Sequence, residues 1–274
     1  MELVMSSLYQ EFKQNGFVVL RNFFSKEEIS QLLDEIKKTG KLFLGVGDEN
    51  TKKMFFYHNL YRKSVYLRGF CSQPRIVDIF SKIIGPSFWI RWDHAVLKKS
   101  EGEQYPWHQD NAYSKVKDAS FQLWVALTDA DEKTGGLFFQ KGSHRKGHLP
   151  HRHFSGRHII CDEKAGEEVK VFAKAGDVII FSSLTLHRSE PNRSDAERWV
   201  YIVEYMSKKH YDPTIQPPYF MIAESGRAKP EFVSWYPGNL SPINQLKYYR
   251  YNKGVQAVRH SLKEAWLYAS GKKR

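Results

Sequence analysis

The stretch Phe121-Gln122-Leu123-Trp124-Val125-Ala126-Leu127 decides the fold class, because aromatic and branched apolar residues of this kind are typical of a β-strand. Similar runs recur along the chain, at residues 17–20, 88–92, 95–97, 137–140, 169–172, 178–181 and 199–206. Turn dipeptides such as Gly135-Gly136 and Gly176-Asp177 precede some of these runs. Many short strands with glycine-rich turns predict a mainly β fold, either a β-sandwich or a jelly roll.

Helices are expected to flank this β-region, over residues 8–14, 25–40, 64–84 and 255–269. Ser25 and Glu28 form a capping box, and Gly40 is expected to end that helix in a left-handed conformation. Pro74 is expected to break or kink the next helix.

The chain is predicted to form one domain over residues 1–274. Within it we expect a helical flank (1–86), a jelly-roll core (about 87–206) and a C-terminal extension (207–274). Six prolines favour loops in this extension, ahead of its final helix.

Composition narrows the function classes. No run of 18 or more apolar residues occurs, and residues 1–12 lack a basic start followed by an apolar stretch, so we expect neither a membrane span nor a secretory signal. Cys71 and Cys161 form no disulfide framework, which favours a cytoplasmic protein with reduced thiols. The net charge of +12 comes from scattered basic residues, which argues against nucleic acid as the main partner and favours an anionic small molecule.

One combination of residues predicts a metal site. His108 and Asp110 stand two apart in Trp107-His108-Gln109-Asp110, where alternate residues of an extended chain share a face, and His187 follows a later strand. Two imidazoles and one carboxylate occupy one face of an octahedral ferrous ion and leave the other face open for a cosubstrate and O₂. Arg198, eleven residues beyond His187, offers a fixed cationic fork for a carboxylate. Taken singly, each residue also fits an ordinary surface or core role.

The surroundings of these residues resemble the phytanoyl-CoA dioxygenase family of iron(II)- and 2-oxoglutarate-dependent oxygenases. The resemblance covers roughly residues 10–210 and is carried by ordered blocks at family spacing: 16–25 (GFVVLRNFFS), 107–110 (WHQD), 123–130 (LWVALTDA), 135–137 (GGL), 141–144 (KGSH), 175–178 (AGDV) and 187–194 (HRSEPNRS), followed by Arg198.

This resemblance implies a double-stranded β-helix in which His108, Asp110 and His187 bind Fe(II). It also implies that Arg198 and Ser189 contact the distal carboxylate of 2-oxoglutarate, and that the ring of Trp124 lines the cosubstrate pocket. O₂ is then the second cosubstrate, and ascorbate is expected to support turnover. Related halogenating enzymes carry a small residue at the position of Asp110, so the retained carboxylate implies oxygenation, most simply hydroxylation.

Several alternatives stay open. The same residues could form a catalytically silent metal- or ligand-binding barrel, or an oxygenase that modifies nucleic acid. Arg193 competes with Arg198 as the carboxylate partner, and Arg188 either contacts an anionic substrate or points outward. The histidines between His144 and His158 are either a solvated loop or a second metal site. Nothing in the sequence selects the substrate, the oligomeric state, or hydroxylation over desaturation or ring formation.

Overall fold

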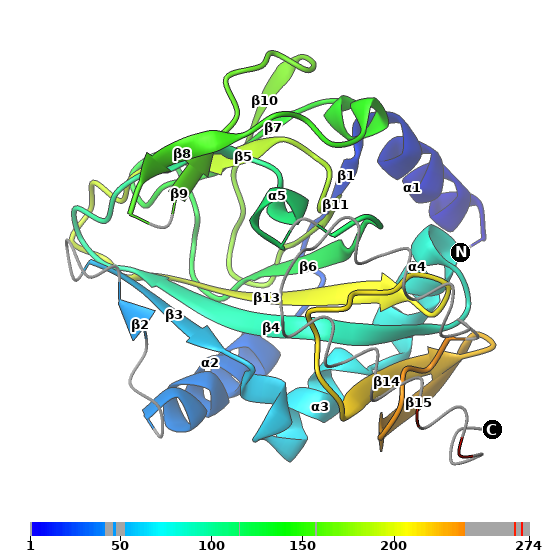
Figure 1. Cartoon of the computed structure of the whole chain (residues 1–274). Helices are drawn as coiled ribbons and strands as arrows, with labels where there is room; N and C mark the ends of the chain where they lie inside the picture. Colours follow the sequence, from blue (N-terminus) through cyan, green and yellow to red (C-terminus); the bar gives the residue numbers. More distant parts are fainter. Residues whose placement is uncertain are drawn as a thin grey trace.

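A large and a small antiparallel sheet lie face to face in the computed structural model, which describes residues 2–41, 46–47, 53–114, 116–156, 158–238, 266 and 270 (Figure 1). The large sheet has the order β1-β11-β6-β13-β4-β14-β15, with β3 also paired to β4 and β2 to β3. Its strands are β1 (Phe17–Leu20), β2 (Val46–Gly47), β3 (Met54–His58), β4 (Phe88–Lys98), β6 (Phe121–Ala126), β11 (Val178–Ser182), β13 (Arg198–Ser207), β14 (Tyr219–Glu224) and β15 (Arg227–Val233).

The small sheet has the order β10-β7-β12-β5. Its strands are β5 (Tyr105–His108), β7 (Leu137–Gln140), β10 (Glu168–Val171) and β12 (His187–Ser189). A separate hairpin pairs β8 (Arg152–Ser155) with β9 (His158–Ile160). The helices are α1 (Glu2–Asn15), α2 (Lys26–Lys41), α3 (Val65–Cys71), α4 (Pro74–Ile84) and α5 (Asp110–Ser114), with 3-10 turns at Leu60–Arg62 and Ser143–Lys146.

The large sheet separates two cores. Along β13, Tyr201 and Val203 pack with helical residues such as Leu32 and Phe80 in one cluster, whereas Val200 packs with residues of the small sheet in the other. Figure 1 shows α2 and α3 on the side of the large sheet away from β5 and β7. Because strand side chains alternate between faces, a slip of one residue would exchange the two cores, and this specifies the register.

The capping box at the start of α2 is confirmed, since the Ser25 and Glu28 backbone N–H groups each donate to the other residue's side chain. The break at Pro74 is also confirmed, because Pro74 takes the first helical position of α4 and separates it from α3. The expected left-handed cap at Gly40 is wrong. Gly40 lies inside α2, and a Cβ there would come within 3.0 Å of the Tyr57 ring, so its small size serves close packing.

The expectation of loops ahead of the final helix is wrong for residues 219–233, because β14 and β15 form a hairpin that pairs with β4. The part of the β4 edge that β3 leaves open, at residues 88–90, supplies hydrogen bonds to β14, and no local pattern reveals that edge. Of the helix expected over 255–269, only Trp266 lies among the described residues, and it is helical. Among the described helices, none combines the length and the apolar character needed to cross a membrane.

Candidate metal and cosubstrate site

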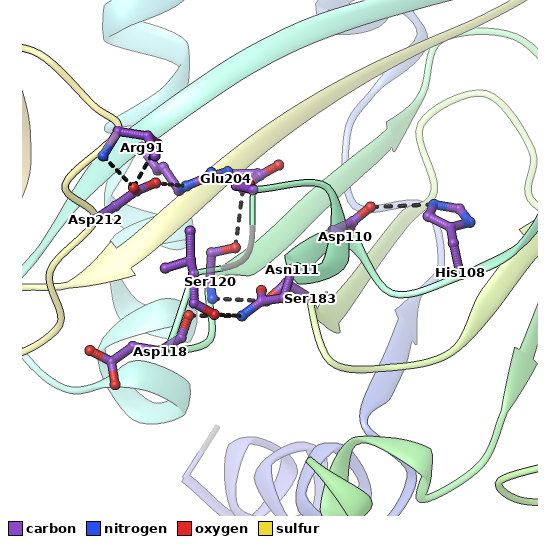
Figure 2. Close-up of polar contacts among 12 residues, drawn as sticks. Arg91, His108, Asp110, Asn111, Asp118, Ser120, Ser183, Glu204 and Asp212 are labelled. Carbon is purple, nitrogen blue, oxygen red and sulfur yellow. Dashed lines mark hydrogen bonds and ion pairs between the residues drawn. The ribbon is translucent and has the colours of Figure 1, made fainter. Parts of the chain in front are cut away.

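Three residues from two neighbouring strands and a helix start converge on one point. In the small sheet, His187 of β12 lies opposite His108 at the end of β5. Asp110 is the first residue of α5, so its carboxylate reaches the histidines from a strand-to-helix turn rather than from the extended chain expected (Figure 2). Asp110 Oδ1 lies 3.4 Å from His108 Nε2 and 3.8 Å from His187 Nε2, and the three ligand atoms all lie within 4.8 Å of one another.

Hydrogen bonds orient both imidazoles. His108 Nδ1 lies 2.7 Å from the Pro106 carbonyl and His187 Nδ1 lies 2.9 Å from the Thr185 carbonyl. Each Nδ1 therefore carries the proton and each Nε2 presents a lone pair to the common point, as in histidines that bind metals.

The electrostatics keep these groups in the protonation states that a metal requires. Burial, and then the neighbouring His108, lower the pKa of His187 to about 4. Burial acts to raise the pKa of Asp110, but the facing imidazoles of His187 and His108 outweigh it and lower that pKa. At neutral pH the site therefore offers a neutral His187 and a carboxylate, which suits a divalent cation.

A second polar group lies where β12 and β13 meet β4. Arg198 is buried, and its Nη1 donates to the Gly135 carbonyl at 2.6 Å, while its Nε has no hydrogen-bond partner. Lys98 is fully buried directly opposite Arg198 in the register, and its Nζ donates to Ser189 Oγ at 3.0 Å. No carboxylate among the described residues lies within ion-pair distance of Arg198 or Lys98. Burial lowers the pKa of Arg198 to about 10, and burial, with the charge of Arg198, holds the pKa of Lys98 well below its usual range.

Gly135 is part of this arrangement. Its φ of +95° is a conformation that glycine adopts readily, and a Cβ there would come within 2.4 Å of the Glu190 carbonyl oxygen. The close approach of the Gly135 loop to the segment after β12 is what brings its carbonyl to Arg198.

One cavity of about 520 Å³ joins the two groups. Its lining includes all three converging residues together with Trp124, Ser189 and Arg198, so the six residues proposed from the sequence share one space. Lys98, which sequence reasoning missed, stands in the same strand phase as Val96 and His94, two residues that line the cavity. A lysine in phase with these two residues, at the end of the apolar run Ala95-Val96-Leu97, is the signal that could have identified it.

Of the remaining candidates, His158 alone lines the cavity among the described residues. Arg193 is exposed and lies 3.5 Å from Glu190. Arg188 points outward, where it forms ion pairs with Glu190 and Glu168 and covers the ring of Phe138 at 3.7 Å. In the described part of the chain the His144–His158 histidines form no cluster with metal-ligand spacing. His151 instead accepts a hydrogen bond from the Gln109 N–H and so braces the loop between His108 and Asp110, and His158 lines the cavity.

Comparison with known proteins decides the family. The sequence model of the phytanoyl-CoA dioxygenase family matches residues 12–200. The chain belongs to this family. One relative is an ectoine dioxygenase from Bordetella parapertussis, which is 25% identical to this chain; the alignment covers 87% of this chain and 85% of the relative. Another is a probable alpha-ketoglutarate-dependent hypophosphite dioxygenase from Stutzerimonas stutzeri, which is 26% identical; that alignment covers 72% of this chain and 76% of the relative.

Solved structures similar to this member of the phytanoyl-CoA dioxygenase family establish its fold. One is the epimerase SnoN in complex with Fe³⁺, alpha-ketoglutarate and nogalamycin RO, with a TM-score of 0.64 and 20% identity over 76% of this chain and 86% of that one. Another is the non-heme monooxygenase ThoJ, with a TM-score of 0.68 and 19% identity over 94% and 99%. Family membership, the jelly-roll fold and the relation to iron- and 2-oxoglutarate-dependent dioxygenases, all expected from the sequence, are confirmed.

Proposed function

We propose that the protein is an Fe(II)- and 2-oxoglutarate-dependent dioxygenase in which His108, Asp110 and His187 bind the iron, and that it hydroxylates a small molecule. The observation that carries this proposal is that one cavity joins a set of metal-ligand atoms to a pair of buried basic side chains. One end offers three ligand atoms within 4.8 Å of one another, and the other offers Arg198 and Lys98 without a carboxylate partner.

The spacing of the two ends fits 2-oxoglutarate. Ser189 follows His187 by two residues on the same face of β12, a step of about 7 Å. A five-carbon diacid spans about 5 Å between its carboxyl carbons, so one carboxylate can reach the iron while the other reaches Ser189 and Arg198. Arg198 would then form a bidentate pair with the distal carboxylate, and Lys98 would hold the Ser189 hydroxyl toward it.

The chain's residues position and shield the reaction. Bound iron would supply the activation of O₂ that couples decarboxylation of 2-oxoglutarate to succinate and CO₂ with oxidation of the substrate. Trp124, Val96 and Val200 line the space between the two ends and exclude water from it. Asp110 keeps a carboxylate on the iron, which supports oxygenation as the outcome.

The names of the relatives, for ectoine and for hypophosphite, support a small-molecule substrate. Only the net positive charge of the chain still supports an anionic substrate, because Arg188 forms ion pairs with Glu168 and Glu190. Two buried, free cysteines, Cys71 and Cys161, support a cytoplasmic location, and residues 1–274 are proposed as a single catalytic domain.

Succinate release is the direct test. The protein is mixed with Fe(II), 2-oxoglutarate, ascorbate and air, and a panel of small molecules is screened for those that stimulate succinate formation. The proposal predicts stimulation by at least one compound class and its loss in His108→Ala. Metal and 2-oxoglutarate binding with no stimulated turnover by any compound would indicate the silent barrel instead.

A further inference from the structure

The cavity has a second polar end, far from Arg198. Glu204 lines it on β13 and lies opposite Trp92 on β4 and opposite Gln122 on β6. Glu204 lies six residue steps along β13 from Arg198, which corresponds to about 20 Å along the strand. A 2-oxoglutarate held by Arg198 therefore cannot reach this end, and Glu204 and Gln122 face whatever else enters the cavity.

Gln122 is poised for a ligand. Its side chain is fully buried and lines the cavity, yet neither its amide oxygen nor its amide nitrogen has a hydrogen-bond partner. Leaving both halves of a buried amide unpaired costs a few kcal/mol, and native structures do so rarely. A bound molecule that accepts one hydrogen bond and donates another would remove this cost.

Glu204 belongs to a buried cluster with an excess of negative charge (Figure 2). The single guanidinium of Arg91 pairs with two carboxylates, Glu204 at 2.7 Å and Asp212. All three side chains are at least nine-tenths buried. The other side chains that contact these charges, the hydroxyls of Ser114 on Arg91 and Ser120 on Glu204 and the indole of Trp92 beside Glu204, are neutral. The two buried carboxylates thus share one cation, and burial, opposed in part by Arg91, raises the pKa of Glu204. A cationic ligand beside Glu204 would supply the counter-charge that this cluster lacks.

The geometry directs this charge into the cavity. Asp212 is fully buried and accepts hydrogen bonds from both the backbone N–H and the hydroxyl of Thr214. Glu204, in contrast, lines the cavity, and the hydrogen bonds from Arg91 and Ser120 both reach its Oε2. Among the described residues that line the cavity, Arg198 is the sole arginine or lysine, and it lies at the opposite end.

We propose that Glu204 and Gln122 recognise the substrate, and that the substrate carries a protonated nitrogen, as in an amine, an amidine or a guanidine, which donates to the Glu204 carboxylate. The amide of Gln122 pairs with polar groups beside that nitrogen. This inference rests on the proposed function, because it assigns the second end of the cavity to the substrate of that reaction. An anionic substrate is disfavoured, since Glu204 and the Asp110 carboxylate would both repel it.

The test is calorimetric binding of matched small molecules to the protein loaded with Fe(II) and 2-oxoglutarate under argon. The probes are small amines, amidines and guanidines, each with a neutral amide or alcohol of the same shape and with a carboxylate. We expect cations to bind at least tenfold more tightly than their neutral counterparts and the carboxylates not to bind.

Two variants locate the contact. Glu204→Gln and Asp212→Asn each remove one carboxylate from Arg91 and leave the cluster with the same net charge, but only Glu204 lines the cavity. Glu204→Gln is expected to weaken cation binding at least tenfold more than Asp212→Asn. Equal losses in the two variants, or equal affinities of wild-type protein for cations and neutral isosteres, would overturn the inference. The wild-type comparison decides it alone if a variant fails to fold. A separate titration with 2-oxoglutarate checks the proposed function. If 2-oxoglutarate does not bind, the proposed function fails, whereas the inference about Glu204 fails only if 2-oxoglutarate binds and the cations show no preference.

Discussion

Replacing Arg198 with methionine is expected to preserve or raise the stability of the protein without cosubstrate, and to abolish the binding of 2-oxoglutarate. Burial lowers the pKa of Arg198 to about 10, and each pKa unit corresponds to about 1.4 kcal/mol, so the charge costs the unliganded fold on the order of 3 kcal/mol. Methionine removes that cost, but it also removes the hydrogen bond to the Gly135 carbonyl, which contributes roughly 1.5 kcal/mol or more. The net change is a gain of about 1 kcal/mol, or roughly 2–4 °C in melting temperature for a chain of this size.

The loss of binding should be much larger. Removing one partner of a buried charge pair costs about 2–5 kcal/mol, a factor of at least thirty in the dissociation constant. In the wild-type protein, 2-oxoglutarate at a hundred times its dissociation constant should stabilise the metal-loaded fold by about 2.7 kcal/mol. Thermal melts with and without 2-oxoglutarate measure both effects. The matched control is Arg193→Met, which replaces an exposed arginine on the connection that leads from β12 to Arg198 and should leave the cosubstrate-induced rise intact.

A melting temperature of unliganded Arg198→Met several degrees below that of the wild type, together with a normal response to 2-oxoglutarate, would refute the reasoning. It would show that Arg198 is a structural cation and that the carboxylate binds elsewhere.

Three other predictions follow from buried titratable groups and from the metal site. Burial and Arg198 hold the pKa of Lys98 low, so the binding of a carboxylate should raise that pKa and take up protons. Calorimetry in buffers of different ionisation enthalpy should detect the proton uptake, and the affinity for the carboxylate should fall as pH rises. Lys98→Met should abolish the proton uptake. Fe(II) or Mn(II) should raise the melting temperature, and His108→Ala should weaken metal affinity at least about a hundredfold. The control His153→Ala, on the exposed β8–β9 hairpin, should leave metal affinity unchanged. Equal metal affinity in the two variants would contradict the ligand set. Burial raises the pKa of Asp93 to about 7, so between about pH 4 and pH 7 the folded state holds a proton that the unfolded chain releases, and stability should fall by up to ~4 kcal/mol as pH rises. Asp93→Asn should flatten this part of the denaturation profile, since both recorded hydrogen bonds, from the Tyr61 N–H and the Tyr201 hydroxyl, reach one oxygen that an amide retains.

The strands of the jelly roll were predictable because each is a short run with its own apolar character. Runs at 121–127, 137–140, 178–181 and 199–206 all correspond to strands, since the apolar pattern that forms a strand is contained within it. The β14–β15 hairpin was missed because its residues form strands by pairing with an open edge of β4, more than a hundred residues earlier. The end of α2 was predicted to within a residue or two, but the role of Gly40 was missed for a similar reason, because the Tyr57 ring rather than a cap explains this glycine.

The chain by itself indicated His108, Asp110, His187 and Arg198 as candidate ligands for a metal and a carboxylate, because these residue types stand at a recognisable spacing. It could not reveal Lys98, Gln122 or Glu204 as parts of the site, since each gains its surroundings from antiparallel partners on other strands. Nor could it show that Arg91 joins Glu204 and Asp212, which lie 113 and 121 residues away. Local preferences specify strands and turns, but the register between distant strands decides which side chains share one buried space, and that register exists only once both cores have packed.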